Sequence, residues 1–254
     1  MRPKAGFRGG AMALKELIYM DSKLHLSYSL IDNKASKNLL FLHGWGSNKE
    51  LMHLSFKDSF KDFNHIYLDL PHFGASPAHI FLDTYGYAAV VRLFMDSLCV
   101  NGKPGCDVVA GHSFGGKISL LLDREIILLS SAGILLPKPL GVRLKIALAK
   151  LTKLVGLRAN FLRAADAKDL NPLVYEIFKC VVKEDFSSAY RDFKHKATVF
   201  WGAADEATPI ACFEAIKSIM PHAKAYKLEG DHYFFMKQAA LIERLYKGLD
   251  SNEG

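Results

Sequence analysis

The sequence predicts an α/β protein with a mostly parallel, doubly wound sheet and a helical insertion. Short apolar runs that do not alternate polar with apolar residues are typical of strands buried on both faces of such a sheet. These runs lie at 38–42, 65–70, 107–111, 125–131 and 197–202. Helical patterns separate or follow them at 84–100, 115–123, 209–220 and 234–249. Strands that alternate with helices indicate a parallel sheet with helices on both faces.

Two segments depart from this alternation. The pair at 14–20 and 24–31 is more nearly alternating and predicts a hairpin at one sheet edge. After the strand at 125–131, residues 137–196 show helical stretches without a good strand, so we expect a helical cap there. The core would then consist of 14–136 and 197–250. Because ligands of such sheets bind beyond the carboxyl ends of the strands, the cap would cover the site.

Composition narrows the class of protein. The chain has 254 residues, 50% of them hydrophobic and 23% charged, which is an ordinary globular composition. We expect residues 1–13 to be a disordered extension, with Met1 and Met12 as alternative translation starts. The sequence contains no apolar run of about 18 residues, so no transmembrane segment is expected. The apolar stretch near the N-terminus is broken by Lys15 and Glu16, which a secretory signal would not contain.

The cysteines and the net charge constrain the compartment and the partners only weakly. The four cysteines are scattered without a C-x-x-C pair, which disfavours disulfide and zinc sites and favours the cytoplasm. The net charge of +7 fits either a lysine-rich surface or an acidic partner. No nucleic-acid-binding module is recognisable, so nucleic acid is not expected as a partner.

The stretch "DVVAGHSFGG" at 107–116 is the main chemical signal. A strand, then G-x-S-x-G, then a helix is typical of a nucleophile elbow, which presents Ser113 above the sheet at a helix N-terminus. A serine nucleophile needs a base and an orienting acid. His232 follows a predicted strand at 224–228, and Asp205 follows the strand at 197–202. The chain order Ser, Asp, His suits a triad on successive strand ends.

Each of these residues also has a plainer interpretation. Ser113 could belong to a glycine-rich turn without chemistry, His232 to a surface loop, and Asp205 to the N-cap of the helix at 209–220. Glu206 and Asp231 are rival acids, although both are offset from the motif. The joint occurrence of the three residues, in this order and after strands, favours catalysis.

A second glycine-rich turn, "FLHGWGSN" at 41–48, follows another strand. The backbone N–H groups of Trp45 and Phe114 are the candidates for an oxyanion hole. His43 and His112 are expected to hydrogen-bond the backbone of the turns rather than to act as bases.

The motifs "HGWG", "DLPHFGAS", "GHSFGG", "WGAADEATP" and "GDH" together resemble the α/β-hydrolase superfamily over nearly the whole chain. The resemblance implies an α/β-hydrolase fold with a helical cap, Ser113 as nucleophile, His232 as base, Asp205 as acid, and no metal or organic cofactor. One motif departs from the superfamily pattern: His72 stands where a glycine is usual. Histidine tolerates positive φ better than most residues. His72, Tyr233 and Arg163 are candidate substrate contacts.

Three substrate classes remain open. In general form the chain resembles carboxylesterases. "LLSSAGI" and the cap length also resemble the meta-cleavage-product hydrolases, which cut C–C bonds in 2-hydroxy-6-oxo-dienoates. That group usually has a glycine-proline-glycine turn and a tryptophan after the histidine, whereas this chain has "HGWGSN" and Tyr233. "HGWG" with "GHSFGG" also resembles methyl esterases that act on carrier-bound pimeloyl groups.

The cap sequence bears on the third class. Between Ile126 and Ala165 the sequence carries no acidic residue and seven basic ones, Lys138, Arg143, Lys145, Lys150, Lys153, Arg158 and Arg163. A basic cap could dock an acidic carrier protein. A helix that covers the site with its lysines in water explains the pattern equally simply. A non-catalytic small-molecule-binding scaffold is the remaining alternative.

Overall fold

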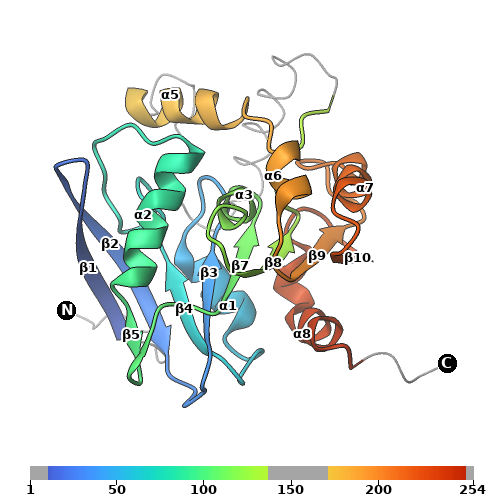
Figure 1. The fold of residues 1–254 in the computed structure, drawn as a ribbon, viewed down its shortest axis with the longest axis horizontal. Helices are drawn as coiled ribbons and strands as arrows, with labels where there is room; N and C mark the ends of the chain where they lie inside the picture. Colours follow the sequence, from blue (N-terminus) through green and yellow to red (C-terminus); the bar gives the residue numbers. More distant parts are fainter. Residues whose placement is uncertain (1–10, 137–170, 250–254) are drawn as a thin grey trace, which may run out of the picture.

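The computed structural model describes residues 11–136 and 171–249. Within these ranges an eight-stranded sheet has the strand order β1-β2-β4-β3-β7-β8-β9-β10. β2 pairs antiparallel with β1 and β4, and every other neighbouring pair is parallel. The predicted fold class, an α/β fold with a mostly parallel sheet, is confirmed. Figure 1 shows the hairpin of β1 and β2 at one edge and β9 and β10 at the other.

The strands match the apolar runs closely. Their bounds are β1 (Ala11–Tyr19), β2 (Ser22–Ile31), β3 (Asn38–Leu42), β4 (Asn64–Leu68), β7 (Val108–His112), β8 (Glu125–Leu129), β9 (Ala197–Gly202) and β10 (Lys224–Leu228). A small separate hairpin of β5 (Cys99–Val100) and β6 (Lys103–Pro104) was not predicted. β1 begins at Ala11, so residues 11–13 belong to the edge hairpin and not to the predicted extension.

The helices are α1 (Lys49–Phe56), α2 (Thr84–Asp96), α3 (Phe114–Ser119), α5 (Pro172–Val181), α6 (Ser187–Asp192), α7 (Ile210–Ile219) and α8 (Ala239–Lys247), with a 3-10 turn η1 (Phe234–Lys237) before α8. Helix α1 was not predicted, and the predicted helix at 234–249 consists of two elements, η1 and α8. The described part of the predicted cap contains α5 and α6, and Figure 1 shows α5 across the top of the view, above α2. The rest of the predicted cap, residues 137–170, lies outside the described ranges.

The two faces of the sheet bury different helices. Alternate residues of a strand point to opposite faces. Leu40 and Leu42 therefore pack with α2, α3 and α5, whereas Leu39 and Phe41 pack with α1, η1 and α8. A third cluster places α6 and α7 against β8 and β9. With both faces covered, the strands of the middle of the sheet are fully buried, and their carboxyl ends meet at a single edge where loops form a site.

Candidate active site

Ser113 lies between β7 and α3 in a strained conformation. Its φ is 51° and its ψ is −110°, a combination that non-glycine residues seldom adopt. Three backbone hydrogen bonds hold it there: its N–H donates to the Leu129 carbonyl at 3.0 Å, and its carbonyl accepts from the N–H groups of Ala132 at 3.0 Å and of Lys117 at 3.2 Å. Such strain persists only where the surroundings impose it. The sharp strand–turn–helix geometry that the motif predicts is therefore present.

Gly115 shows why the turn needs small residues. A Cβ at this position would lie 2.5 Å from the Leu42 carbonyl oxygen and 2.7 Å from that of His43. Helix α3 can therefore approach the end of β3 only because Gly115 has no side chain. This contact brings the start of α3 next to the glycine-rich turn that follows β3.

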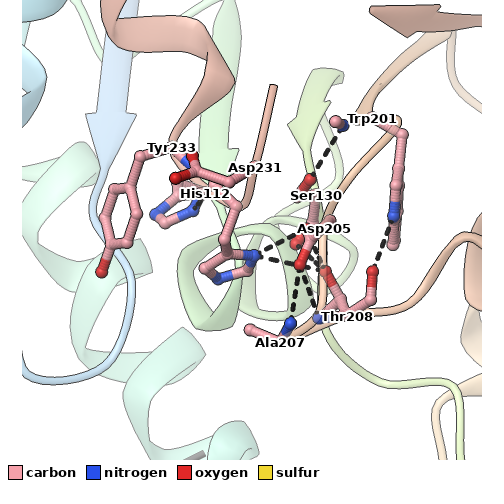
Figure 2. A network of polar contacts seen from close by, with 10 residues as sticks. His112, Ser130, Trp201, Asp205, Ala207, Thr208, Asp231 and Tyr233 are labelled. Carbon is pink, nitrogen blue, oxygen red and sulfur yellow. Dashed lines mark hydrogen bonds and ion pairs between the residues drawn. The ribbon is translucent and has the colours of Figure 1, made fainter. Parts of the chain in front are cut away.

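Asp205 and His232 face each other from the ends of β9 and β10. His232 Nδ1 lies 2.7 Å from Asp205 Oδ2, and the Asp205 side chain is fully buried. Figure 2 shows the Asp205 carboxylate with Ala207 and Thr208 beside it, whose N–H groups both donate to Oδ1 at 2.9 Å. Burial raises the pKa of Asp205, but the hydrogen bonds outweigh it and hold the pKa below the usual value. Asp205 is therefore a carboxylate that can orient His232.

Thr208 is a contact that sequence reasoning missed. Its hydroxyl donates to Asp205 Oδ2 at 2.8 Å and lies 3.4 Å from His232 Nδ1. The motif "DEATP" places Thr208 three residues after Asp205, but nothing in the motif predicts that the Thr208 side chain contacts the Asp205 carboxylate. Thr208 thus holds the oxygen that His232 contacts.

The two candidate oxyanion donors lie on adjacent turns. Phe114 is the first residue of α3, and the first N–H groups of a helix have no partner inside the helix. Trp45 belongs to the turn closed by the Ser47 N–H donating to the Gly44 carbonyl at 3.2 Å. The Trp45 and Phe114 rings are in edge contact, with centroids 5.4 Å apart. The structure therefore brings together the two residues whose N–H groups the sequence predicted as donors.

The two histidines left out of the triad contact backbone groups. His43 Nε2 accepts from Leu70 N–H at 3.0 Å, so its Nδ1 donates to the Gly44 carbonyl at 2.8 Å. His112 Nε2 donates to the His232 carbonyl at 3.0 Å. Burial lowers the pKa of both histidines, that of His112 well below its usual value. Both are thus neutral supports of the turns, as their positions predicted.

A buried ion pair supports the turn after β3. Lys49 Nζ lies 2.7 Å from Asp69 Oδ2, and the Lys49 N–H donates to Asp69 Oδ1 at 2.7 Å. Glu50 also contacts Lys49 Nζ at 2.8 Å. Burial lowers the pKa of Lys49, but the two carboxylates outweigh it and raise the pKa above its ordinary value. This pair ties the start of α1 to the loop that follows β4.

The candidate residues surround one cavity. Ser113, His232, Trp45, Phe114 and Tyr233 all line a cavity of about 330 Å³. This volume lies near the lower end of small-molecule sites, which span roughly 300–1,000 Å³. Apolar side chains from the end of α5 line it as well, including Phe178, Val181 and Val182.

The three candidate substrate contacts have different outcomes. Tyr233 lines the cavity, its ring centroid 5.5 Å from that of His232, and burial raises the pKa of its hydroxyl to about 12. His72 adopts a φ of 72°, and both ring nitrogens have protein partners, the Tyr87 hydroxyl at 2.8 Å and the Ile80 carbonyl at 3.0 Å. His72 is not among the described residues that line the cavity, so its turn interpretation holds and its substrate contact stays a prediction. Arg163 lies outside the described residues.

The described residues contain neither a metal-binding cluster nor a membrane-spanning helix. No group of three or more His, Cys, Asp or Glu side chains is arranged to hold a metal ion in residues 11–136 and 171–249. None of the helices described there has the length and apolar character needed to cross a membrane.

The sheet, the elbow and the cavity at the carboxyl ends of the strands define the α/β-hydrolase class. The chain belongs to the alpha/beta hydrolase family, because the model of that family matches residues 39–244. No curated protein sequence is significantly similar to the chain.

Solved structures share the fold at low sequence identity. A membrane phospholipase A, described as a bacterial virulence factor, has a TM-score of 0.74 and 18% identity over 93% of this chain and 85% of its own. A lipase-esterase related protein from Clostridium acetobutylicum has a TM-score of 0.66 and 21% identity over 88% and 98% of the two chains. A thermophilic esterase from Thermogutta terrifontis has a TM-score of 0.67 and 14% identity over 94% and 97%.

Proposed function

We propose that this protein is a serine hydrolase that cleaves carboxylic esters with Ser113, His232 and Asp205. The observation that carries the proposal is the Asp205–His232 hydrogen bond of 2.7 Å beside a cavity that His232 shares with the strained Ser113. A nucleophile, a base and an orienting acid at one cavity are what acyl transfer requires.

In the proposed mechanism Ser113 Oγ attacks the ester carbonyl while His232 Nε2 accepts its proton. Asp205 keeps the proton of His232 on Nδ1 and stabilises the positive charge that forms on the ring. The N–H groups of Trp45 and Phe114 stabilise the oxyanion. His232 then protonates the leaving alcohol, and a water molecule, activated by the same histidine, releases the acid. The mechanism needs no metal or organic cofactor.

The apolar wall of the cavity favours an ester with an apolar acyl group over a 2-hydroxy-6-oxo-dienoate. Lys117 is the only lysine or arginine among the described residues that line the cavity, and it is already paired with Glu184. A dienoate carboxylate would therefore lack a free cation within the described part of the site. The basic residues that suggested an acidic carrier protein lie in 138–163, outside the described residues, so that alternative stays a prediction.

The test is hydrolysis of p-nitrophenyl esters from acetate to octanoate by the wild type and by Ser113→Ala. We expect turnover by the wild type and a loss in the variant of at least about 10³-fold, because removal of a triad nucleophile leaves only binding and oxyanion stabilisation. Ser119→Ala, a hydroxyl removal in the same helix that keeps Ser113, is the matched control.

Equal activity of Ser113→Ala and wild type would contradict the proposed nucleophile. A wild type that hydrolyses no ester would favour the C–C bond hydrolase, the carrier-bound methyl ester or the binding scaffold. Turnover of a dienoate and of a carrier-bound methyl ester would then separate these alternatives.

A further inference from the structure

Lys117 is a buried cation in the helix that carries the proposed nucleophile. It lies one turn after Ser113 in α3, and its side chain is 1% exposed. Its Nζ donates to the Val181 carbonyl at 2.6 Å and to Glu184 Oε2 at 2.5 Å, and it lies 4.5 Å from the centroid of the Phe186 ring. All three partners belong to the segment 181–186 that joins α5 to α6.

Glu184 connects this segment to a second core helix. Its carboxylate accepts from the Thr84 N–H at 3.3 Å and from the Thr84 hydroxyl, at the first residue of α2. The Lys117 amine is therefore already occupied, so it is neither a base for Ser113 nor a free cation for a substrate. The pair fastens segment 181–186 to α3 and to α2.

The same part of the chain forms an apolar wall of the cavity. Phe178, Val181 and Val182 line the cavity, and the Phe178 ring lies 5.3 Å from that of Trp45. Val181 supplies both a wall side chain and the carbonyl that Lys117 contacts. A shift of segment 181–186 therefore moves the wall relative to Ser113.

We infer that the Lys117–Glu184 pair is a specificity-determining anchor that holds the wall of Phe178, Val181 and Val182 against α3 and thereby limits the length of the acyl group. The inference rests on the proposed ester hydrolysis and names a residue pair that governs its substrate range. Removal of one partner leaves the other as an unpaired buried charge. Glu184, whose side chain is 18% exposed, gains fuller hydration of its charge only if its segment moves.

The first experiment compares acyl selectivity in Lys117→Met and in Lys117→Met/Glu184→Gln. The double variant removes both charges and keeps an oxygen that accepts from Thr84, so it tests the anchor even if the single variant does not fold. The ratio of kcat/KM for p-nitrophenyl octanoate to that for acetate is measured for each protein. We expect this ratio to rise at least about tenfold in both variants, a change of about 1.4 kcal/mol. The matched control is Lys103→Met, which breaks the Lys103–Asp107 pair of 2.7 Å beside the amino end of β7; its ratio is expected to equal that of the wild type.

The second measurement does not depend on catalysis. Limited trypsin digestion, with mass spectrometry of the fragments, gives the rate of cleavage after Lys183. Lys117→Met leaves the sequence around that bond unchanged. We expect cleavage there to accelerate at least fivefold in this variant and to stay at the wild-type rate in Lys103→Met.

An active wild type with an unchanged octanoate-to-acetate ratio in both variants would overturn the inference and leave the proposed function intact. Faster cleavage with an unchanged ratio would overturn the specificity role, because the anchor would then be only structural. A wild type inactive on every ester would overturn the proposed function and, with it, this role.

Discussion

The two halves of the candidate site are built in different ways. In the half formed by β3, β7 and α3, the backbone makes the geometry: Ser113 is strained, and Gly115 lies against the Leu42 carbonyl. In the half formed by β9 and β10, side chains make it: Asp205 accepts from His232 at 2.7 Å and from Thr208 Oγ1 at 2.8 Å.

The difference has a consequence for mutation. A change that disturbs the packed backbone of the first half moves strands and helices of the core, so stability and activity should fall together. A change in the side-chain network of the second half can remove a proton acceptor or a hydrogen bond without moving the sheet. Activity and stability should therefore be separable for side-chain changes in the second half and inseparable for changes that disturb the backbone packing of the first.

Among changes in the half formed by β9 and β10, Asp205→Asn is expected to cause the largest loss of activity. The side-chain amide can donate to His232 Nδ1 and hold the imidazole in the wrong tautomer, so we expect kcat to fall roughly 10⁴-fold. The backbone N–H groups of Ala207 and Thr208 keep an oxygen acceptor, so the thermal midpoint should change little. Ester kinetics and thermal unfolding on the same preparation check both expectations.

Asp231→Asn is the control for this prediction, because Asp231 is a rival acid that accepts from the Tyr233 N–H at 2.8 Å. Its kcat should fall far less than that of Asp205→Asn. The opposite order of the two losses would move the proposed acid to Asp231.

Gly115→Ala tests the first half. Its Cβ would lie 2.5 Å from the Leu42 carbonyl oxygen, so α3 or β3 must move. We expect the free energy of unfolding in urea to fall by about 3 kcal/mol, with loss of ester hydrolysis in the same protein. Gly102→Ala is the control: its φ is 79°, but a Cβ there meets nothing within 4 Å. It should cost about 1 kcal/mol from backbone strain alone and leave activity intact. A fully stable but inactive Gly115→Ala protein would contradict the proposed coupling.

The sequence predicted the strands and the turn at Ser113, because these features depend on short-range patterns. The apolar runs at 38–42 and 197–202 coincide with β3 and β9, and the glycines around Ser113 predicted its sharp turn. Short-range patterns do not encode which side chains meet across the fold. Lys117 and Glu184 are 67 residues apart, and no periodicity in the sequence predicts their contact.

His72 illustrates the same limit. Its position in a turn predicted a positive φ correctly, but its ring turns inward to Tyr87, 15 residues along the chain. A long-range partner therefore decided the role of the side chain, whereas the backbone followed its local sequence. The backbone-built half of the site was accordingly the easier half to predict in detail.

Thr208→Val is the smallest and most selective change. Valine has nearly the shape of threonine but lacks the hydroxyl that donates to Asp205 Oδ2 at 2.8 Å. His232 keeps its contact with the same oxygen, and the backbone N–H of residue 208 still donates to Oδ1. We expect kcat/KM to fall about tenfold, or about 1.4 kcal/mol, because one of several hydrogen bonds to a buried carboxylate is lost. Thr208→Ser retains the hydroxyl and should keep most of the activity. If serine fails as badly as valine, the threonine methyl group contributes through packing, and the second half of the site depends on the fold as closely as the first.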